Sequence, residues 1–214
     1  MGALSGPRPL LTAIAAMCAV VVASNILVQF PVHGRIGAVV LADLLTYGAF
    51  TYPLAFLVTD LTNRRFGPRA ARLVVVAGFA LAVVLSWIAA SPRIAIASGS
   101  AFVVAQLLDV AVFDRLRRGT WWRAPLISSL IGSLVDTALF FSIAFSAGFG
   151  FLGPNDAFAL APAGFLGVFA VETPRWISWA AGDLAVKLIV AVALLGPYRA
   201  LMRVIRPRPA AAEA

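Results

Sequence analysis

Several ionisable and amide side chains lie inside strongly apolar stretches of this 214-residue sequence. They are Asn25, Gln29, Asp60, Gln106, Asp109, Asp136, Asp183 and Lys187. An aspartate or lysine at the centre of a membrane helix costs roughly 2.5–3.5 kcal/mol, so such groups normally face a protein interior, a partner or a wet cavity. The set therefore predicts a buried polar site.

The spacing of three of these groups suggests how they are paired. Asp183 and Lys187 are four residues apart and share a helix face, either as a self-neutralising ion pair or as part of a functional site. Asp136 has no basic residue within reach on its own helix. It needs Lys187 from another helix, a bound proton, or a wet cavity.

The remaining carboxylates, Asp60 and Asp109, lie closer to the ends of their apolar stretches, where arginines follow. Asp60 can pair with Arg64. Asp109 can pair with Arg115 or Arg117, whose long side chains reach along the helix. Each carboxylate can equally face a solute, so both interpretations stay open.

The amide groups are spaced so that each shares a face with another polar residue. Gln106 precedes Asp109 by three residues, and Asn25 precedes Gln29 by four. Small residues accompany them and permit close helix packing. These are Ala97, Ala101, Ala105, Ser128 and Gly132.

Aromatic residues follow the same stretches, and a proline, Pro53, is expected to kink its helix. The aromatic residues are Phe50, Tyr52, Phe56, Phe140 and Phe141. Carboxylates and amides can bind the N–H and carbonyl edges of a flat ring while aromatic side chains cover its faces. The predicted substrate site therefore comprises Asn25, Gln29, Tyr52, Asp60, Gln106, Asp109, Asp136, Asp183 and Lys187.

The elements that must position these residues are transmembrane helices. The chain is 62% hydrophobic and 12% charged, with a mean hydropathy of +0.96, far from the roughly 25% charge of soluble domains. In lipid a helix satisfies its backbone polar groups within one segment. The prediction is an all-α polytopic membrane protein, one domain over residues 1–209, with spans at about 10–30, 44–62, 71–90, 94–114, 125–147 and 177–198.

Three segments fall outside those spans. Residues 36–45 are apolar but too short to cross, and predict a half-inserted hairpin or a surface helix, with Gly34 and Gly37 permitting a turn. Residues 148–176 predict an amphiphilic flap on the membrane surface. Residues 210–214 predict a disordered tail. Trp121, Trp122, Trp176 and Trp179 fall at span ends, as in an interfacial aromatic belt.

The arginines predict the orientation of the spans. Arg35, Arg93 and Arg175 lie on one side of the membrane. The opposite side has the other thirteen: Arg8, Arg64, Arg65, Arg69, Arg72, Arg115, Arg117, Arg118, Arg123, Arg199, Arg203, Arg206 and Arg208. Because basic loops stay in the cytoplasm, both termini are predicted to be cytoplasmic.

The composition argues against several other functions. One histidine, His33, and one cysteine, Cys18, supply no material for a histidine triad, a zinc site or an intrachain disulfide. The net charge of +8 is explained by loop arginines, so no nucleic-acid partner is predicted. No enzyme activity, metal or cofactor is predicted.

Five separated blocks resemble the queuosine precursor transporter family, also called the vitamin uptake transporter family. The blocks are "ASNILVQFPV", "GAFTYPLAFLVTDLTNRRFG", "AQLLDVAVFDRLR", "WWRAPLISSLIGSLVDTALFFSIAF" and "DLAVKLIV". Together they extend from the first span to the sixth. The resemblance adds Thr62 and Thr137 to the polar positions above.

The resemblance implies a six-helix importer of the bacterial inner membrane. Its substrates would be 7-cyano-7-deazaguanine and, as a second candidate, 7-aminomethyl-7-deazaguanine, which are precursors of queuosine in tRNA. The segment 33–43 and the loop 148–176 depart from the family pattern, which leaves free queuine open as a substrate.

Two other functions and the oligomeric state stay open. The chain could be the substrate-binding subunit of a multi-component vitamin or nucleobase transporter, since it has no nucleotide-binding motif of its own. An intramembrane enzyme could use Asp136 and Asp183 as an aspartyl dyad. A homodimer is compatible with the sequence.

Overall fold

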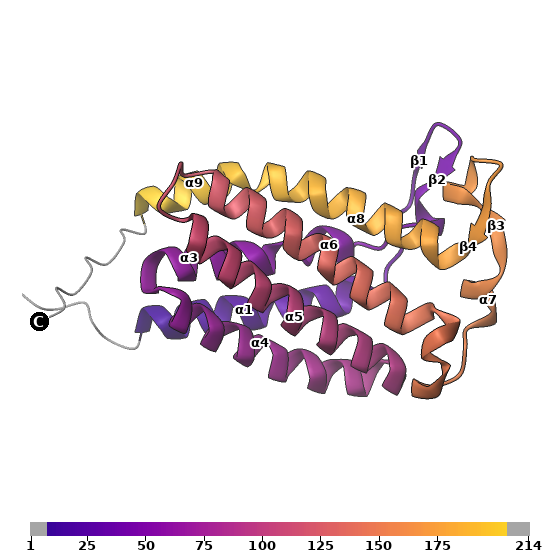
Figure 1. Ribbon diagram of the computed structural model, residues 1–214, viewed down its shortest axis with the longest axis horizontal. Helices are drawn as coiled ribbons and strands as arrows, with labels where there is room; N and C mark the ends of the chain where they lie inside the picture. The colour runs from indigo at the N-terminus through magenta and orange to yellow at the C-terminus, as the bar shows by residue number, and fades with distance from the viewer. Residues whose placement is uncertain (1–7, 205–214) are drawn as a thin grey trace, which may run out of the picture.

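The computed structural model describes residues 8–204 as an elongated helix bundle (Figure 1). Its long helices are α1 (Arg8–Leu27), α4 (Pro68–Ala89), α5 (Pro92–Leu116), α6 (Arg123–Phe145) and α8 (Arg175–Ala193), which continues as α9 (Leu195–Val204). Among the described residues, five helical stretches are long and apolar enough to cross a membrane. The prediction of an all-α membrane protein is confirmed.

The predicted span boundaries agree with most of these helices. The predictions 10–30, 71–90, 94–114 and 125–147 match α1, α4, α5 and α6 to within a few residues. The prediction 177–198 covers α8 and the start of α9. The predicted tail, residues 210–214, lies outside the described residues.

The predicted span 44–62 is not a continuous helix. It consists of a single turn, α2 (Gly48–Thr51), and a longer helix, α3 (Leu54–Phe66), which meet at Pro53. Proline cannot donate a backbone hydrogen bond, and its ring prevents a regular helix through it. This break confirms the expected kink, and α3 runs four residues beyond the predicted boundary.

One end of the bundle consists of short irregular segments. Strands β1 (Arg35–Ile36) and β2 (Val39–Val40) form an antiparallel hairpin around Gly37, whose φ of 59° suits glycine, and the 3-10 turn η1 (Leu41–Asp43) follows. The segment predicted as a hairpin or a surface helix is therefore a hairpin. We call this the hairpin end.

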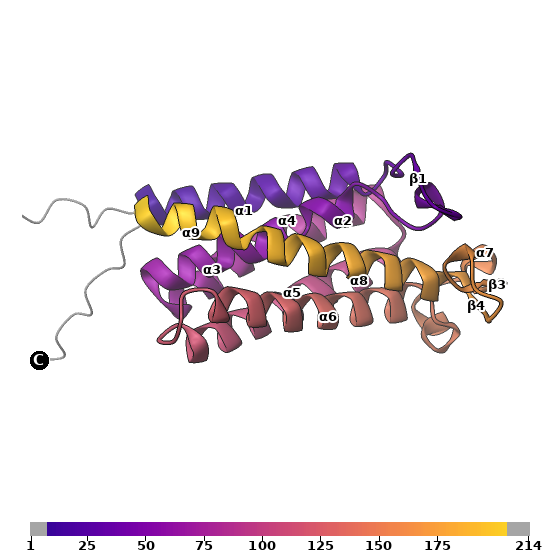
Figure 2. The same ribbon diagram turned by 90° about the horizontal axis from the view of Figure 1, so that it is seen from above.

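The long loop also lies at the hairpin end (Figures 1 and 2). It contains η2 (Ala147–Leu152), α7 (Ala157–Leu160), β3 (Pro162–Gly164), η3 (Phe165–Gly167) and β4 (Glu172–Pro174). Strands β3 and β4 pair antiparallel. The predicted flap is thus a folded loop with one short helix and one short hairpin.

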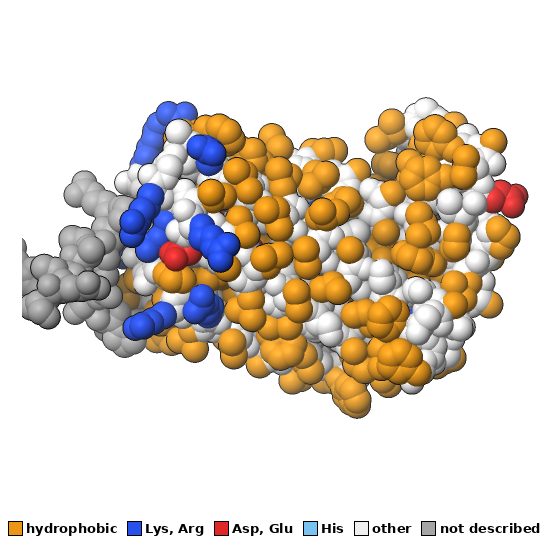
Figure 3. All heavy atoms as spheres, in the orientation of Figure 1, with side chains coloured by type: hydrophobic (Ala, Val, Ile, Leu, Met, Phe, Trp, Pro, Cys, Tyr) orange, Lys and Arg blue, Asp and Glu red, His pale blue; other side chains and the backbone are white. Residues whose placement is uncertain are grey.

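The opposite end carries the basic residues, and we call it the arginine-rich end. On the face shown in Figure 3, arginine side chains gather there, while hydrophobic side chains cover the middle of the bundle. The first and last described residues, Arg8 and Val204, also lie at this end (Figures 1 and 2).

The main apolar core joins helices α1, α3, α4 and α5. Met17 on α1, Ala55 on α3, Val74 on α4 and Phe102 on α5 are almost fully buried in it. The close packing expected at Ala97, Ala101 and Ala105 is confirmed, because all three are buried on α5. Helices α5 and α6 consequently form a compact wall for the site.

Gly132 on α6 packs so closely against α3 that a side chain does not fit there. A Cβ atom added there would lie 2.6 Å from the buried ring of Phe56 on α3. We expect Gly132→Ala to destabilise the protein by about 1–3 kcal/mol, the usual cost of overpacking. Thermal unfolding in detergent measures this effect. Gly196→Ala is the matched control, since nothing lies within 4 Å of its added Cβ; equal unfolding temperatures for the two variants would contradict the prediction.

Candidate functional site

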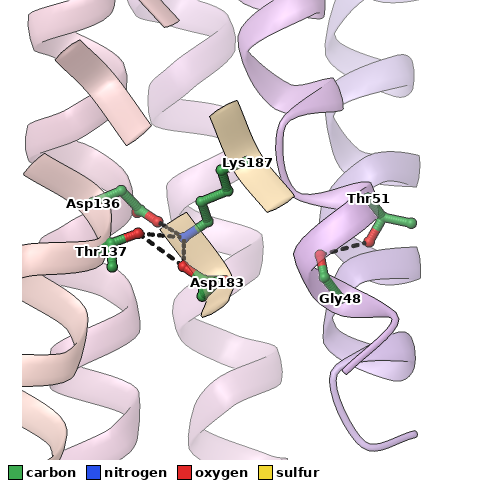
Figure 4. A network of polar contacts seen from close by, with 6 residues as sticks. All are labelled: Gly48, Thr51, Asp136, Thr137, Asp183 and Lys187. Carbon is green, nitrogen blue, oxygen red and sulfur yellow. Dashed lines mark hydrogen bonds and ion pairs between the residues drawn. The ribbon is translucent and has the colours of Figure 1, made fainter. Parts of the chain in front are cut away.

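The centre of the site is the ammonium group of Lys187 on α8 (Figure 4). Its Nζ lies 2.7 Å from Asp136 Oδ2 on α6 and 2.5 Å from Asp183 Oδ2 one turn earlier on α8. Thr137 on α6 accepts a hydrogen bond from Lys187 at 3.2 Å and donates one to Asp183 Oδ2 at 2.8 Å. Four side chains from two helices thus form one network.

The network answers the question of how the ionisable groups are paired. Lys187 supplies the partner that Asp136 lacks on its own helix, as predicted. Asp183 is also paired with Lys187, and the two carboxylates bind the ammonium between them, not each other. The network has two acids and one base, so its formal charge is −1.

A large cavity reaches this network from the hairpin end. Its volume is about 700 Å³, within the range of small-molecule sites. The walls come from α1, the segment 38–52, α5, α6, the long loop and α8. Five predicted site residues line it: Asn25, Tyr52, Asp136, Asp183 and Lys187.

Aromatic side chains form one wall of the cavity. Phe140, Phe141 and Phe145 on α6 line it together with Phe158 on α7 and Trp179 on α8. The rings of Phe158 and Trp179 are stacked at 6.1 Å, and Phe145 meets Trp179 edge to face at 5.4 Å. The cavity therefore offers apolar faces beside a charged base, as a flat polar ring requires.

The structure adds residues that the sequence did not single out. Phe158 lies in the predicted surface flap, and Trp179 was assigned to an interfacial belt, yet both line the cavity. Arg175 also lines it and holds its guanidinium 4.1 Å from the Phe158 ring centre. In the sequence, a loop rich in Phe and followed by Trp and Arg is compatible with a wall of a binding cavity, but it is equally compatible with a segment on the membrane surface.

The long loop is fastened to the bundle by the buried side chain of Arg93 at the start of α5. Its guanidinium donates to the backbone carbonyls of Ile143, Ser146, Gly153 and Pro154 and to Asn155 Oδ1, over 2.5–3.4 Å. A buried guanidinium is stable here because its donors are shared among oxygen acceptors.

A second polar cluster lies between the cavity and the arginine-rich end. Three contacts join α3 to α5, and we call them the α3–α5 seam. Thr59 donates to Gln106 Oε1 at 2.6 Å, and Asn63 donates to the Val110 carbonyl at 3.0 Å. Between them, the carboxyl groups of Asp60 and Asp109 lie within hydrogen-bonding reach of each other.

Three of the predicted site residues belong to the α3–α5 seam and not to the cavity wall. Asp60, Gln106 and Asp109 are at most 2% exposed and do not line the cavity. Gln29 is exposed at the end of α1, where its amide donates to the backbone carbonyl of Asn25 at 3.2 Å. The nine predicted residues thus fall into a cavity group, a seam group and one surface residue.

The suggested arginine partners of the seam carboxylates are engaged elsewhere. Arg64 donates to the Tyr198 hydroxyl at 3.0 Å and to the Arg117 carbonyl at 2.5 Å, and no ion pair joins it to Asp60. Arg117 pairs with Asp114 at 2.9 Å. Within residues 8–204, Asp60 and Asp109 therefore have no cationic partner in contact.

Comparison with known proteins agrees with these features. A sequence model of the family described as "Putative vitamin uptake transporter" matches residues 46–91 and 85–201. The chain is 40% identical over 147 residues to the "Queuosine precursor transporter" of Escherichia coli K12, covering 59% of this chain and 64% of that one. No solved structure matches.

Two further relatives have related names. The "Probable queuosine precursor transporter" of Haemophilus influenzae is 39% identical over 153 residues, which is 59% of this chain and 65% of the relative. That of Bacillus subtilis is 30% identical over 128 residues, which is 47% and 56%. The matched region thus spans just under two thirds of the length of the first two relatives.

The matches and the structure agree on the class of protein. The family model covers most of the chain, including all the cavity residues on α6 and α8. The structure has several apolar helices long enough to cross a membrane, and the relatives are bacterial transporters. Together these findings indicate a multi-pass protein of the bacterial inner membrane. The chain belongs to the putative vitamin uptake transporter family.

Proposed function

We propose that this protein imports queuosine precursors, with 7-cyano-7-deazaguanine as the main substrate and 7-aminomethyl-7-deazaguanine as the second. The observation that carries the proposal is the cavity whose base holds Asp136, Asp183 and Lys187 beside aromatic walls. The names of the relatives support the same substrate class.

The chemistry of the cavity base suits a guanine-like ring. Such a ring has adjacent N–H donors on one edge and a carbonyl beside them. The carboxylate oxygens of Asp136 or Asp183 that do not bind Lys187 can accept from the N–H groups, and the ammonium can donate to the carbonyl. Tyr52, whose ring centre lies 5.7 Å from the Lys187 ammonium, and Asn25 also line the cavity as further polar contacts.

The charge of the network fits both substrates. With a formal charge of −1, it favours a ligand that presents N–H donors. The aminomethyl compound is a cation at neutral pH and gains an additional attraction. The cyano compound is neutral and depends on hydrogen bonds and ring stacking with Phe158 and Trp179.

We further propose six membrane crossings in one domain, with both termini in the cytoplasm. The broken pair α2–α3 provides the crossing that is not a single long helix, and broken helices are tolerated where they line a cavity. The arginine-rich end then faces the cytoplasm and the hairpin end faces outward. The cavity is open toward the outer side, which is the loading state of an importer.

The direct test is restoration of queuosine in a host that cannot make its precursors. With low external 7-cyano-7-deazaguanine, we expect the chain to restore queuosine in tRNA when the host's own transporter is deleted. Nucleoside analysis of hydrolysed tRNA measures the result. A host that expresses the protein in its membrane and still lacks queuosine would show that the assignment is wrong.

Uptake by the purified protein distinguishes an autonomous transporter from a binding subunit. We expect liposomes containing this chain alone to take up labelled 7-cyano-7-deazaguanine. A substrate-binding subunit of a larger transporter would bind the compound but transport it only with added partner proteins.

A further inference from the structure

We propose that Asp60 and Asp109 share one proton and form a proton-binding site that couples substrate import to proton entry. The role in transport rests on the proposed function, whereas proton binding itself does not. The site is separate from the substrate cavity, since neither aspartate lines it.

The first argument is the contact between two buried acids without a base. Asp60 on α3 is 1% exposed, Asp109 on α5 is fully buried, and their carboxyl groups lie within hydrogen-bonding reach of each other. Two ionised carboxylates at this distance repel strongly in a low-dielectric interior. A single shared proton turns the repulsion into a hydrogen bond, as in other carboxylate pairs.

The second argument is that Asp109 lacks a donor. Neither of its carboxyl oxygens accepts a hydrogen bond from an N–H or O–H group within residues 8–204. Ser128 on α6 lies against both acids, and its one hydroxyl proton is directed to Asp60 Oδ1 at 3.3 Å. A buried carboxyl without a donor is costly, and a proton between the two acids supplies the missing one.

Among the described residues, the one charged group near the pair makes no ion pair with it. Arg64, one turn further along α3, has two of its donors committed to Tyr198 and Arg117 and lies over the Phe113 ring. Tyr198 faces the pair from α9 and Ser128 from α6, and both are neutral. Elsewhere in the seam, Gln106 and Asn63 are amides, so Arg64 is the only charged neighbour among the described residues.

The position of the pair links it to the cavity. Tyr52 lines the cavity immediately before Pro53, and Asp60 follows seven residues later, about 10 Å along α3. On α5, Ser98 and Ala101 line the same cavity that Asp109 lies below. The seam is therefore linked to the substrate space by α5, which lines the cavity, and by Tyr52, which lines it two residues before α3 begins.

The α3–α5 seam also suggests how proton binding controls the opening of the protein toward the arginine-rich end. With the proton present, Asp60 and Asp109 join α3 to α5, and the protein is closed toward the arginine-rich end, as in this structure. When the proton leaves, the pair changes from one negative charge to two, and repulsion separates the helices on that side. A void of about 10 Å³ beside Asp60, bordered by Tyr198 and Leu194, provides space of about one water for the proton to leave.

The transport test uses liposomes with purified wild type, Asp109→Asn and Asp60→Asn. An inward proton gradient is expected to drive accumulation of 7-cyano-7-deazaguanine in the wild type. The variants are expected to lose this accumulation at least about tenfold, because an amide cannot release a proton, while still exchanging labelled for unlabelled substrate. Asp114→Asn, the same change five residues further along α5, is the control and keeps both activities.

The outcomes separate the two proposals. No exchange by the wild type contradicts the proposed function, not the proton site. Wild-type accumulation that ignores the proton gradient, or follows a sodium gradient, overturns proton coupling. So does gradient-driven accumulation by both aspartate variants at the wild-type level.

A second measurement tests the proton without substrate. Loss of the shared proton places a second negative charge beside the first inside the protein, so the unfolding temperature of the wild type should fall as the pH rises. Asp109→Asn removes one of the two acids, so its unfolding temperature in detergent should fall less steeply with pH than that of the wild type and should exceed it at alkaline pH. Identical slopes for wild type, Asp109→Asn and Asp114→Asn overturn the shared proton.

Discussion

Replacing Lys187 with methionine is expected to abolish uptake and to lower the amount of folded protein in the membrane. Methionine fills similar space but leaves Asp136 and Asp183 facing each other without their common cation. Removing one member of a buried ion pair typically costs about 3–5 kcal/mol, and Lys187 is only 4% exposed. Fluorescence-detected size exclusion and whole-cell uptake measure the two effects.

A second substitution separates folding from function in this experiment. In Asp136→Asn/Lys187→Met, the network loses one positive and one negative charge and returns to a formal charge of −1. We expect folded protein to recover substantially, while uptake stays absent because the ammonium is gone. If the double variant transports normally, Lys187 is only a structural counter-ion.

Asp136→Asn alone is expected to weaken substrate binding strongly without loss of the fold. Lys187 retains Asp183 at 2.5 Å as a counter-ion, so no buried charge is left alone. A hydrogen bond to a charged group contributes about 1.5–3 kcal/mol, which corresponds to an increase of about 10- to 150-fold in the Kd for 7-cyano-7-deazaguanine. Titration calorimetry on the purified protein measures it.

The matched control for this prediction is Gln29→Ala. Gln29 is exposed, does not line the cavity, and donates its side-chain amide to the backbone of Asn25, so the Kd of this variant should equal that of the wild type. An unchanged Kd in Asp136→Asn would show that the ring binds elsewhere in the cavity, and the aromatic wall around Trp179 would then be the next place to test.

The pairing at the base of the cavity could be predicted because few charges were available. Lys187 is the sole lysine in the sequence, it shares a face with Asp183, and Asp136 had no basic residue near it on its own helix. With one lysine available, Lys187 was the expected partner of both Asp136 and Asp183. The long helices could be predicted for a similar reason, since lipid leaves an apolar chain of this length few alternatives.

The depth of each polar residue could not be predicted in the same way. Helical spacing shows that Gln106 and Asp109 share a face, but not which helix lies opposite at that level. Here α3 lies opposite and supplies Thr59 and Asp60, which closes the seam below the cavity. The ion pair suggested for Asp60 and Arg64 failed because Tyr198, from the other end of the chain, takes the guanidinium.

The sequence also did not predict that the long loop lines the cavity. An apolar loop rich in Phe fits a membrane surface as well as a binding wall, and Phe158 reaches Trp179 only because β3 and β4 fold the loop back onto α8. Such contacts depend on tertiary structure, which residue type alone does not encode.

The fastening of the long loop by Arg93 has a kinetic consequence. Its guanidinium binds three oxygen acceptors of the loop and two at the end of α6, so the loop opens rarely. The β1–β2 segment across the cavity is held to its neighbours mainly by backbone hydrogen bonds near Pro31 and Thr46. Widening of the mouth then depends on residues 34–47. Changes that stiffen this segment should slow arrival and departure of the solute by the same factor and leave the equilibrium constant untouched.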